Sequence, residues 1–435
     1  MTETTPPSQS PDQESASPGP IAPIPSITNE LATFIRNAHA ISDTLPIALT
    51  ALNEARKTSD ERYRTFLEDK GTLTSENAHT KSYNVPPAHY PQLLHLKRDY
   101  ESTRAGQRIL PQTAIVSLVA MFDAFVGGLL RCLFTIKPQI LDASERSLPF
   151  SQLSEFSSIE EAKQFIIEKE IESILRKSHP DQFEWLEKRF SIPLRKDLPS
   201  WSTFIEVTER RHMFVHTGGR VTDQYLAVCR RHNVQFQAEP QLGDQLRVTP
   251  SYFKEAYTCF VEIAVKLAQV LWRKLTPTSL ADADTSLIAT TYDLLVLRQY
   301  DLAVVLLEFA CFTLKKYCND ENRRICVINL AQAYKWTRRN QDCTQLVNQE
   351  DWTSSSAKFR LGVAVLLDDF EKASSLMRQQ GPKGEVAEHD YRTWPLFQEF
   401  RRSQEFASAF EDIFGFPFTA TADAPAQSEG DPAGP

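Results

Sequence analysis

The residues best suited to chemistry lie in one short segment, ERRHMFVH at positions 209–216. Arg211 is followed directly by His212 and, five positions on, by His216. Histidine exchanges protons near neutral pH, and arginine offers a planar charged fork for phosphate oxygens. Metal-free cleavage of RNA needs a base for the ribose 2′-hydroxyl, an acid for the departing 5′-oxygen and a cation for the phosphorane. Arg211 and His216 are therefore the predicted catalytic pair, with His212 as a third candidate.

The spacing of this pair predicts how many copies of the chain build the site. At about 100° per residue, positions 211 and 216 diverge by about 140° around a regular helix. His216 should also lie in the last helical turn, where the helix dipole favours its protonated form by about 0.3–1 kcal/mol. Since one helix does not hold the two groups side by side, we expect a homodimer in which two 209–216 segments meet across a two-fold axis.

Basic residues gather around this segment although the whole chain is acidic. The net charge is −8, which argues against coating of nucleic acid through bulk electrostatics. Residues 186–232 nevertheless hold nine Lys or Arg against five acids, a local surplus of four positive charges that would attract RNA phosphates. A solvated face of mixed charge is the alternative. The predicted RNA-binding residues are Arg210, Arg220, Arg230 and Arg231.

The helix that carries these residues has clear sequence boundaries. It should begin after Pro199, with Ser200 or Ser202 available as a cap, and end at Gly218-Gly219, a strong helix stop. Ser158 and Glu161 resemble a capping box ahead of another amphipathic helix. Shorter and longer helices are expected at 182–190 and 251–274.

Two further predictions concern the first third of the chain. Residues 26–70 suggest two helices interrupted near Pro46, followed by a loop at 71–91 and a helix at 93–108. Residues 111–134 form the most apolar stretch, a helix beginning at Pro111. Because Gly127-Gly128 would allow close helix approach, we expect this helix to supply part of the dimer interface.

The sequence from 278 onward has a loose internal repeat. The segments RQYDLAVVLL, RRNQDCTQLV and DDFEKASSLM each place a small residue after a turn, at Ala303, Cys343 and Ala373. This pattern resembles degenerate tetratricopeptide-type (TPR) helical hairpins. A plain helical domain is the alternative.

The string ERRHMFVHTGGRVTDQYL resembles the signature of the HEPN superfamily (higher eukaryotes and prokaryotes nucleotide-binding). That signature is an Arg, four to six residues, then a His; here His212 stands where Asn is commonest, which leaves its role open. Gly219, Val221, Tyr225 and Leu226, and the upstream LVAMFDAFVGGLL, are also similar to HEPN nucleases. The resemblance covers about 105–275. It implies a bundle of four or five helices, a homodimer and metal-independent endoribonuclease activity, often in toxin–antitoxin or anti-phage defence systems.

Other classes of protein find less support in the sequence. The common NTPase, dinucleotide-binding, hydrolase-elbow and zincin motifs do not occur. The seven cysteines are scattered without a C-x-x-C pair, so no metal site and no cofactor are predicted. No eighteen-residue apolar run lacks a charge, and the N-terminus does not resemble a secretory signal. We therefore expect a cytoplasmic protein without a membrane partner.

These observations predict a mainly α protein. Its expected parts are disordered tails at 1–25 and 416–435, N-terminal helices at 26–104, a HEPN domain at 105–277 and a TPR-like domain at 278–415 that a regulatory protein could contact. The favoured function is a dimeric endoribonuclease acting as a toxin or defence effector. The alternative is a non-catalytic HEPN/TPR-like interaction or RNA-binding scaffold.

Overall fold

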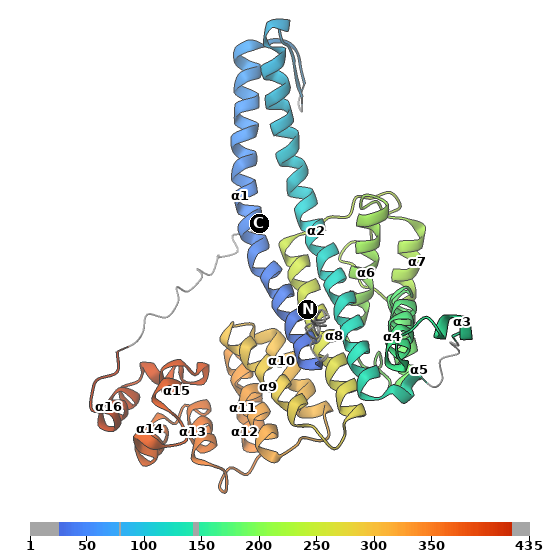
Figure 1. Ribbon diagram of the computed structural model, residues 1–435. Helices are drawn as coiled ribbons and strands as arrows, with labels where there is room; N and C mark the ends of the chain where they lie inside the picture. Colours follow the sequence, from blue (N-terminus) through green and yellow to red (C-terminus); the bar gives the residue numbers. More distant parts are fainter. Residues whose placement is uncertain (1–25, 78–79, 142–147, 420–435) are drawn as a thin grey trace, which may run out of the picture.

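The computed structural model describes residues 26–77, 80–141 and 148–419. It is mainly helical, with 74% helix and 3% strand, which confirms the predicted class. Figure 1 shows three parts: a long two-helix stalk, a helical bundle at its base, and a C-terminal set of shorter helices beside the bundle. The tails predicted to be disordered lie outside the described residues, except for 416–419.

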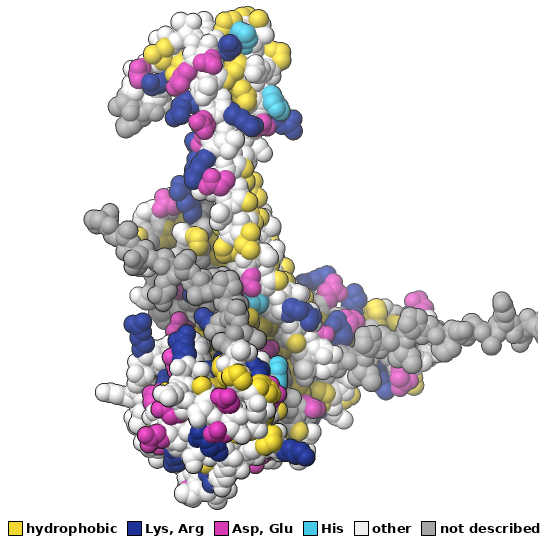
Figure 2. Space-filling view, turned by 90° about the vertical axis from the view of Figure 1, so that its left-hand side faces the viewer, with side chains coloured by type: hydrophobic (Ala, Val, Ile, Leu, Met, Phe, Trp, Pro, Cys, Tyr) yellow, Lys and Arg dark blue, Asp and Glu magenta, His cyan; other side chains and the backbone are white. Residues whose placement is uncertain are grey.

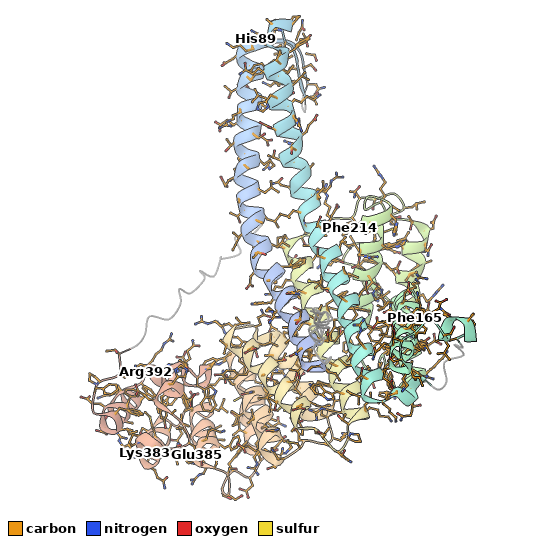
Figure 3. The ribbon with its side chains drawn as sticks, in the orientation of Figure 1. His89, Phe165, Phe214, Lys383, Glu385 and Arg392 are labelled. Carbon is orange, nitrogen blue, oxygen red and sulfur yellow. The ribbon has the colours of Figure 1, made fainter. Side chains whose placement is uncertain are left out.

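The stalk is an antiparallel pair of very long helices, α1 (Ile27–Lys70) and α2 (Tyr90–Ile136). A small hairpin of β1 (Thr72–Glu76) and β2 (Lys81–Asn84) and a 3-10 turn, η1 (Pro87–His89), join them at the tip, where Figure 3 labels His89. The strands pair from Thr72↔Asn84 to Glu76↔Lys81, so part of the predicted loop is a β-hairpin. Figure 2 shows charged and hydrophobic side chains mixed along the stalk surface.

Two predicted helix breaks are wrong, because Pro46 and Pro111 both lie inside continuous helices. A proline inside a helix removes one backbone hydrogen bond and crowds the preceding turn. The long packing of α1 along α2 offsets this local cost. Polar contacts also stabilise the helix pair: Arg104 forms an ion pair with Asp60 at 3.3 Å, and Gln107 donates to Asn53 at 3.1 Å. As a consequence, the expected boundary at residue 104 falls in the middle of α2.

The lower half of α2 is the centre of the bundle. Around it pack the beginning of α1 and four helices: α4 (Ile159–Leu175), α5 (His179–Phe190), α6 (Trp201–His216) and α8 (Pro250–Leu275). A fifth helix, α7 (Asp223–Arg231), packs against α6 (Figure 1). Phe122 of α2 is fully buried, with the rings of Phe204 and Phe260 both 5.2 Å away. Two short turns, η2 (Pro138–Leu141) and α3 (Phe150–Leu153), complete the bundle.

Helix α2 is therefore a core helix. By length and composition it could cross a membrane, but 61% of its most apolar window is buried inside the protein. The glycines expected at a dimer interface are also covered within one chain. A Cβ at Gly127 would lie 3.2 Å from Leu175, and one at Gly128 would collide with Glu30. The expectation that this face of the helix at 111–134 meets a partner is thus wrong, since α1 and α4 already occupy it.

Beyond α8 the chain forms three helical hairpins. They are α9 (Ala281–Val296) with α10 (Tyr300–Glu308), α11 (Asp320–Trp336) with α12 (Asn340–Asn348), and α13 (Ala357–Leu366) with α14 (Phe370–Gln380). A short π-helical segment, η3 (Phe309–Thr313), follows α10. The end of the domain contains η4 (Gly381–Lys383), α15 (Glu388–Thr393), η5 (Pro395–Phe397), η6 (Phe400–Arg402) and α16 (Gln404–Phe414).

The three hairpins have the same kind of turn between their two helices. The turn residues Arg298, Arg338 and Asp368 all have left-handed φ, between 57° and 61°. The small residues singled out in the repeat are buried early in each second helix: Ala303, Cys343 and Ala373 are at most 2% exposed. Their backbone N–H groups donate to the residues four positions earlier, which end the turns. The repeated sequence therefore encodes a repeated helical hairpin, and its likeness to TPR stays a prediction.

Candidate functional site

The candidate site lies at the C-terminal end of α6. This helix ends at His216, and Gly218 and Gly219 reverse the chain with φ of +61° and +86°. The Gly219 N–H donates to the Met213 carbonyl at 2.9 Å, and a Cβ at Gly219 would lie 2.6 Å from Gln245 Nε2. The predicted helix stop is confirmed. Ser200 occupies the N-cap position, as predicted, but its side chain makes no cap hydrogen bond; Ser202, the other candidate, lies inside the helix.

The end of α6 rests on a small core of its own. This core joins α6 to α7 and to the loop before α8, through the buried side chains of Met213, Val221, Tyr225, Leu226, Cys229 and Leu246. Phe214, labelled in Figure 3, lies on the side of α6 that faces α2 and contacts both this core and the main one. The backbone of residues 209–216 is thus fixed from two sides, while one side stays open.

The open side presents the predicted catalytic residues. His212 and His216 are exposed and one turn apart, with ring centroids 4.4 Å from each other. Val215, 48% exposed, lies on the same sector of the helix. Arg211 borders this sector and is half-buried; its Nε is shielded from solvent and has no hydrogen-bond partner among the described residues. The last two turns of α6 therefore hold two imidazoles and a guanidinium that lacks a partner at Nε in the described structure.

The two histidines influence each other. Partial burial, the neighbouring His216 and the charge of Arg211 lower the pKa of His212 below its ordinary value. Each of these effects disfavours the imidazolium form. His212 is therefore biased toward the neutral form, which can accept a proton at neutral pH.

Arg210, by contrast, belongs to a buried network. Its Nε donates to Glu206 at 2.7 Å and its Nη1 to the Arg247 carbonyl at 2.7 Å. The hydroxyls of Tyr225 and Tyr252 both donate to the same Glu206 carboxylate at 2.6 Å. Burial and the nearby Glu206 raise the pKa of both tyrosines. The network ties α6, α7 and α8 together, a position that does not favour the predicted contact of Arg210 with RNA.

The role of Glu206 was not recognised in the sequence. One signal was present: Glu206 and Arg210 are four positions apart, the spacing of an ion pair on a helix. That spacing usually indicates a solvent-exposed pair, whereas the Glu206 residue is only 5% exposed. Its tyrosine partners come from α7 and α8, so only the folded structure shows the network.

The remaining predicted RNA-binding residues lie in two separate parts of the structure. Arg220 is exposed in the loop after α6, close to the candidate site. Arg230 and Arg231 lie at the far end of α7, where His232 packs 6.3 Å from Trp201, the first residue of α6. The length of α6 puts that end about 20 Å from His216. The basic segment is therefore not one continuous patch around the site.

Within the part of the chain that the structure describes, no group of three His, Cys, Asp or Glu is arranged to hold a metal ion. Comparison with known proteins found no matching family model, no matching curated protein and no matching solved structure. The chemistry of the site therefore rests on its own residues.

Proposed function

We propose that this protein is a metal-independent endoribonuclease of the HEPN type, whose site is the C-terminal end of α6, from Arg211 to His216. The observation that carries the proposal is the open sector of this helix end, which His212 and His216 occupy and Arg211 borders, on a fixed backbone. Arg210, next along the chain, is engaged by Glu206, whereas the Arg211 Nε has no partner in the described residues. Leaving a half-buried cation incompletely paired is costly unless a ligand completes it.

The proposed reaction needs proton transfer and charge stabilisation. His212, biased toward its neutral form, takes the proton of the ribose 2′-hydroxyl, and the 2′-oxygen attacks phosphorus. Protonated His216 gives its proton to the 5′-oxygen as the P–O5′ bond breaks. Arg211 holds the phosphate oxygens while negative charge builds up on them. The products are a 2′,3′-cyclic phosphate and a 5′-hydroxyl.

The proposal includes a second copy of the chain. Arg211 and His216 point about 140° apart around α6, so one copy does not direct both at a single phosphate. Two α6 ends facing each other through the sector around Val215 would bring four histidines and two arginines to one cleft. Because the glycine face of α2 is covered, this open sector replaces it as the proposed contact. We further propose a cytoplasmic toxin or defence effector whose TPR-like domain contacts a regulatory protein.

The test is cleavage of total RNA by purified protein in EDTA, with the ends mapped. Cleavage that persists in EDTA and leaves cyclic or 3′-phosphate ends supports the mechanism. A strict requirement for a divalent metal, or products with 3′-hydroxyl ends, would contradict the proposed mechanism. For the variant His216→Ala in the same assay, His95→Ala is the matched control, because His95 is an exposed histidine on the stalk. Its ion pair with Asp99 is long, at 3.6 Å.

The second candidate is a non-catalytic scaffold that binds RNA or protein. The projecting stalk and the three repeated hairpins favour it, since both offer large surfaces for partners. RNA binding without cleavage in the same assay would select this function.

A further inference from the structure

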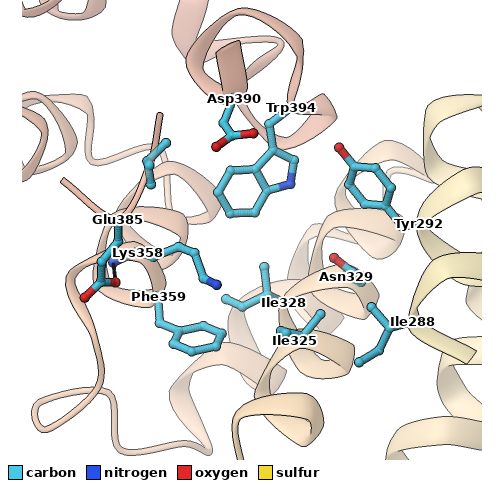
Figure 4. A pocket seen from close by; sticks show the side chains of 11 residues that line it. Ile288, Tyr292, Ile325, Ile328, Asn329, Lys358, Phe359, Glu385, Asp390 and Trp394 are labelled. Carbon is cyan, nitrogen blue, oxygen red and sulfur yellow. Dashed lines mark hydrogen bonds between the residues drawn. The ribbon is translucent and has the colours of Figure 1, made fainter. Parts of the chain in front are cut away.

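A cavity in the C-terminal domain has the composition of a ligand site. It has a volume of about 290 Å³ and lies between the first helices of the three hairpins, α9, α11 and α13. The segment 385–394 closes over it, as Figure 4 shows. A volume near 300 Å³ is the lower end of the range for small-molecule sites. The cavity is separate from the end of α6, so ligand binding there does not depend on the proposed nuclease activity.

The walls of the cavity are mainly apolar. Ile288, Ile325 and Ile328 come from α9 and α11, and Phe359 comes from α13. The indole of Trp394 stands opposite them (Figure 4). A ligand would therefore bury an aliphatic or aromatic group here.

Two donor groups in the cavity are incompletely engaged. Asn329 is 3% exposed, and its Nδ2 has no hydrogen-bond partner among the described residues. A buried donor left unpaired costs about 1–3 kcal/mol. Lys358 directs its amine into the cavity in Figure 4, where the amine lies 5.3 Å from the centre of the Phe359 ring and makes a long contact, 3.6 Å, to Glu321. Both groups would be satisfied by an acceptor oxygen on a ligand.

The carboxylates that line the cavity are already occupied. Glu385 accepts the backbone N–H of Lys358 at 3.1 Å, and the Ser356 hydroxyl and this N–H lower its pKa. Asp390 accepts the backbone N–H of Ala387 at 3.1 Å. Both acids thus serve helix N-termini, while the donors remain available. A ligand that pairs with the Asn329 amide and the Lys358 amine must consequently bring acceptor oxygens, and Lys358 is the group beside which it can place a negative charge.

We propose that this cavity binds a monocarboxylate attached to an apolar group. Lys358 is the one cation among the described residues that line it, which matches a single negative charge better than a phosphate ester. Asn329 donates to the carboxylate, and Trp394 and the isoleucines hold the apolar group. The same chemistry is offered by a small branched-chain or aromatic acid and by the free C-terminal residue of a peptide.

Calorimetry on the full chain tests this proposal with N-acetyl-leucine and its carboxamide, N-acetyl-leucinamide. The acid should bind, and the amide should bind about tenfold more weakly or not at all, since a charge-assisted hydrogen bond is lost. Equal binding of acid and amide, or no binding of either, would overturn the proposal. The peptide Gly-Gly-Ser-Leu, with free and amidated ends, identifies the source: tighter binding of the free peptide than of the acid points to a peptide C-terminus, and weaker binding to a small acid.

Substitutions of Lys358 and Asn329 test the role of each residue in binding. Lys358→Met should weaken binding of the acid about tenfold. Lys383→Met is the matched control, because Lys383 (labelled in Figure 3) is exposed on η4 and is not among the residues that line the cavity, so this variant should change nothing. Asn329→Leu should weaken binding severalfold and raise the melting temperature, since it removes an unpaired buried donor. If the two lysine variants behave alike, or Asn329→Leu lowers the melting temperature without weakening binding, the assignment is wrong.

Discussion

Arg210 and Arg211 are neighbours in the chain, yet they belong to two regions of α6 with opposite construction. Arg210 lies in a closed region, where Glu206, Tyr252 and a backbone carbonyl surround its guanidinium. Arg211 lies at the edge of an open region, beside two exposed histidines, with its Nε unpaired in the described structure. The first region has the properties of a structural clamp and the second those of a binding surface.

The contrast shows how one helix can carry both roles. A charge that stabilises the fold needs partners within the chain, because a buried ion without them is costly. A charged side chain that binds a ligand must keep some of its N–H donors free for that ligand. The closed region fixes α6 against α7 and α8, so the open region is held in place without using its own polar groups.

The largest expected effect is on catalysis in the open region. Arg211→Ala and His216→Ala should each lower RNA cleavage by about 10²–10⁴-fold, the usual contribution of a positioned acid or base. Neither variant should lose more than about 0.5 kcal/mol in the free energy of unfolding in urea, since neither side chain holds the core and Arg211→Ala also removes the Nε that is unpaired in the described structure. Cleavage at the wild-type rate by either variant means that the residue is wrongly assigned.

The closed region should show the opposite behaviour. Glu206→Ala removes the carboxylate that accepts from the Arg210 Nε and from two tyrosine hydroxyls, so we expect a loss of about 3–5 kcal/mol in the free energy of unfolding. The matched control is Glu239→Ala, which removes the exposed ion pair with Arg230 and should cost less than about 1 kcal/mol. Urea denaturation followed by circular dichroism measures both. Equal effects of the two variants would erase the distinction between the regions.

A smaller effect is expected when defective copies are combined. Arg211→Ala and His216→Ala chains, purified as a mixed dimer with two different tags, should regain part of the activity that each lacks alone. The reason is that one intact arginine and one intact histidine can face each other across the two-fold axis. Light scattering that shows a fully active monomer would rule out the shared site.

The smallest effect concerns proton binding within the open region. The pKa of His212 is lowered, so its proton-accepting form is present at neutral pH and is lost as the pH falls through that lowered value. Cleavage should therefore decline on acidification below about pH 6.5, the ordinary histidine value. His216→Gln removes one repulsive neighbour and should raise the pKa of His212, as followed by NMR of labelled histidine. A falling or constant pKa would contradict the proposed coupling.

Local features were predictable where the cause is local. The end of α6 at Gly218-Gly219, the N-cap at Ser158 and the small residues of the three hairpins all follow from contacts within a few residues. The reciprocal bond of a capping box is shifted by one position, since the Glu161 carboxylate accepts from the N–H of Ser157. The predictions failed at Pro46 and Pro111, where packing between two long helices outweighs a local penalty. The clamp of Glu206 was missed because its tyrosine partners lie 19 and 46 positions away.

The sequence by itself determined the helical class, the position of Arg211 and His216 at a helix end, and their divergence around that helix. These properties depend on the fixed rise and rotation of an α-helix and on residues close in the chain. Only the tertiary structure decided which arginine is closed in and which borders the open sector. It also covered the glycine face of α2 and left the Asn329 Nδ2 without a partner among the described residues, in the cavity that Lys358 also lines. Burial and hydrogen-bond partners arise from segments far apart in sequence, and no short-range pattern encodes them.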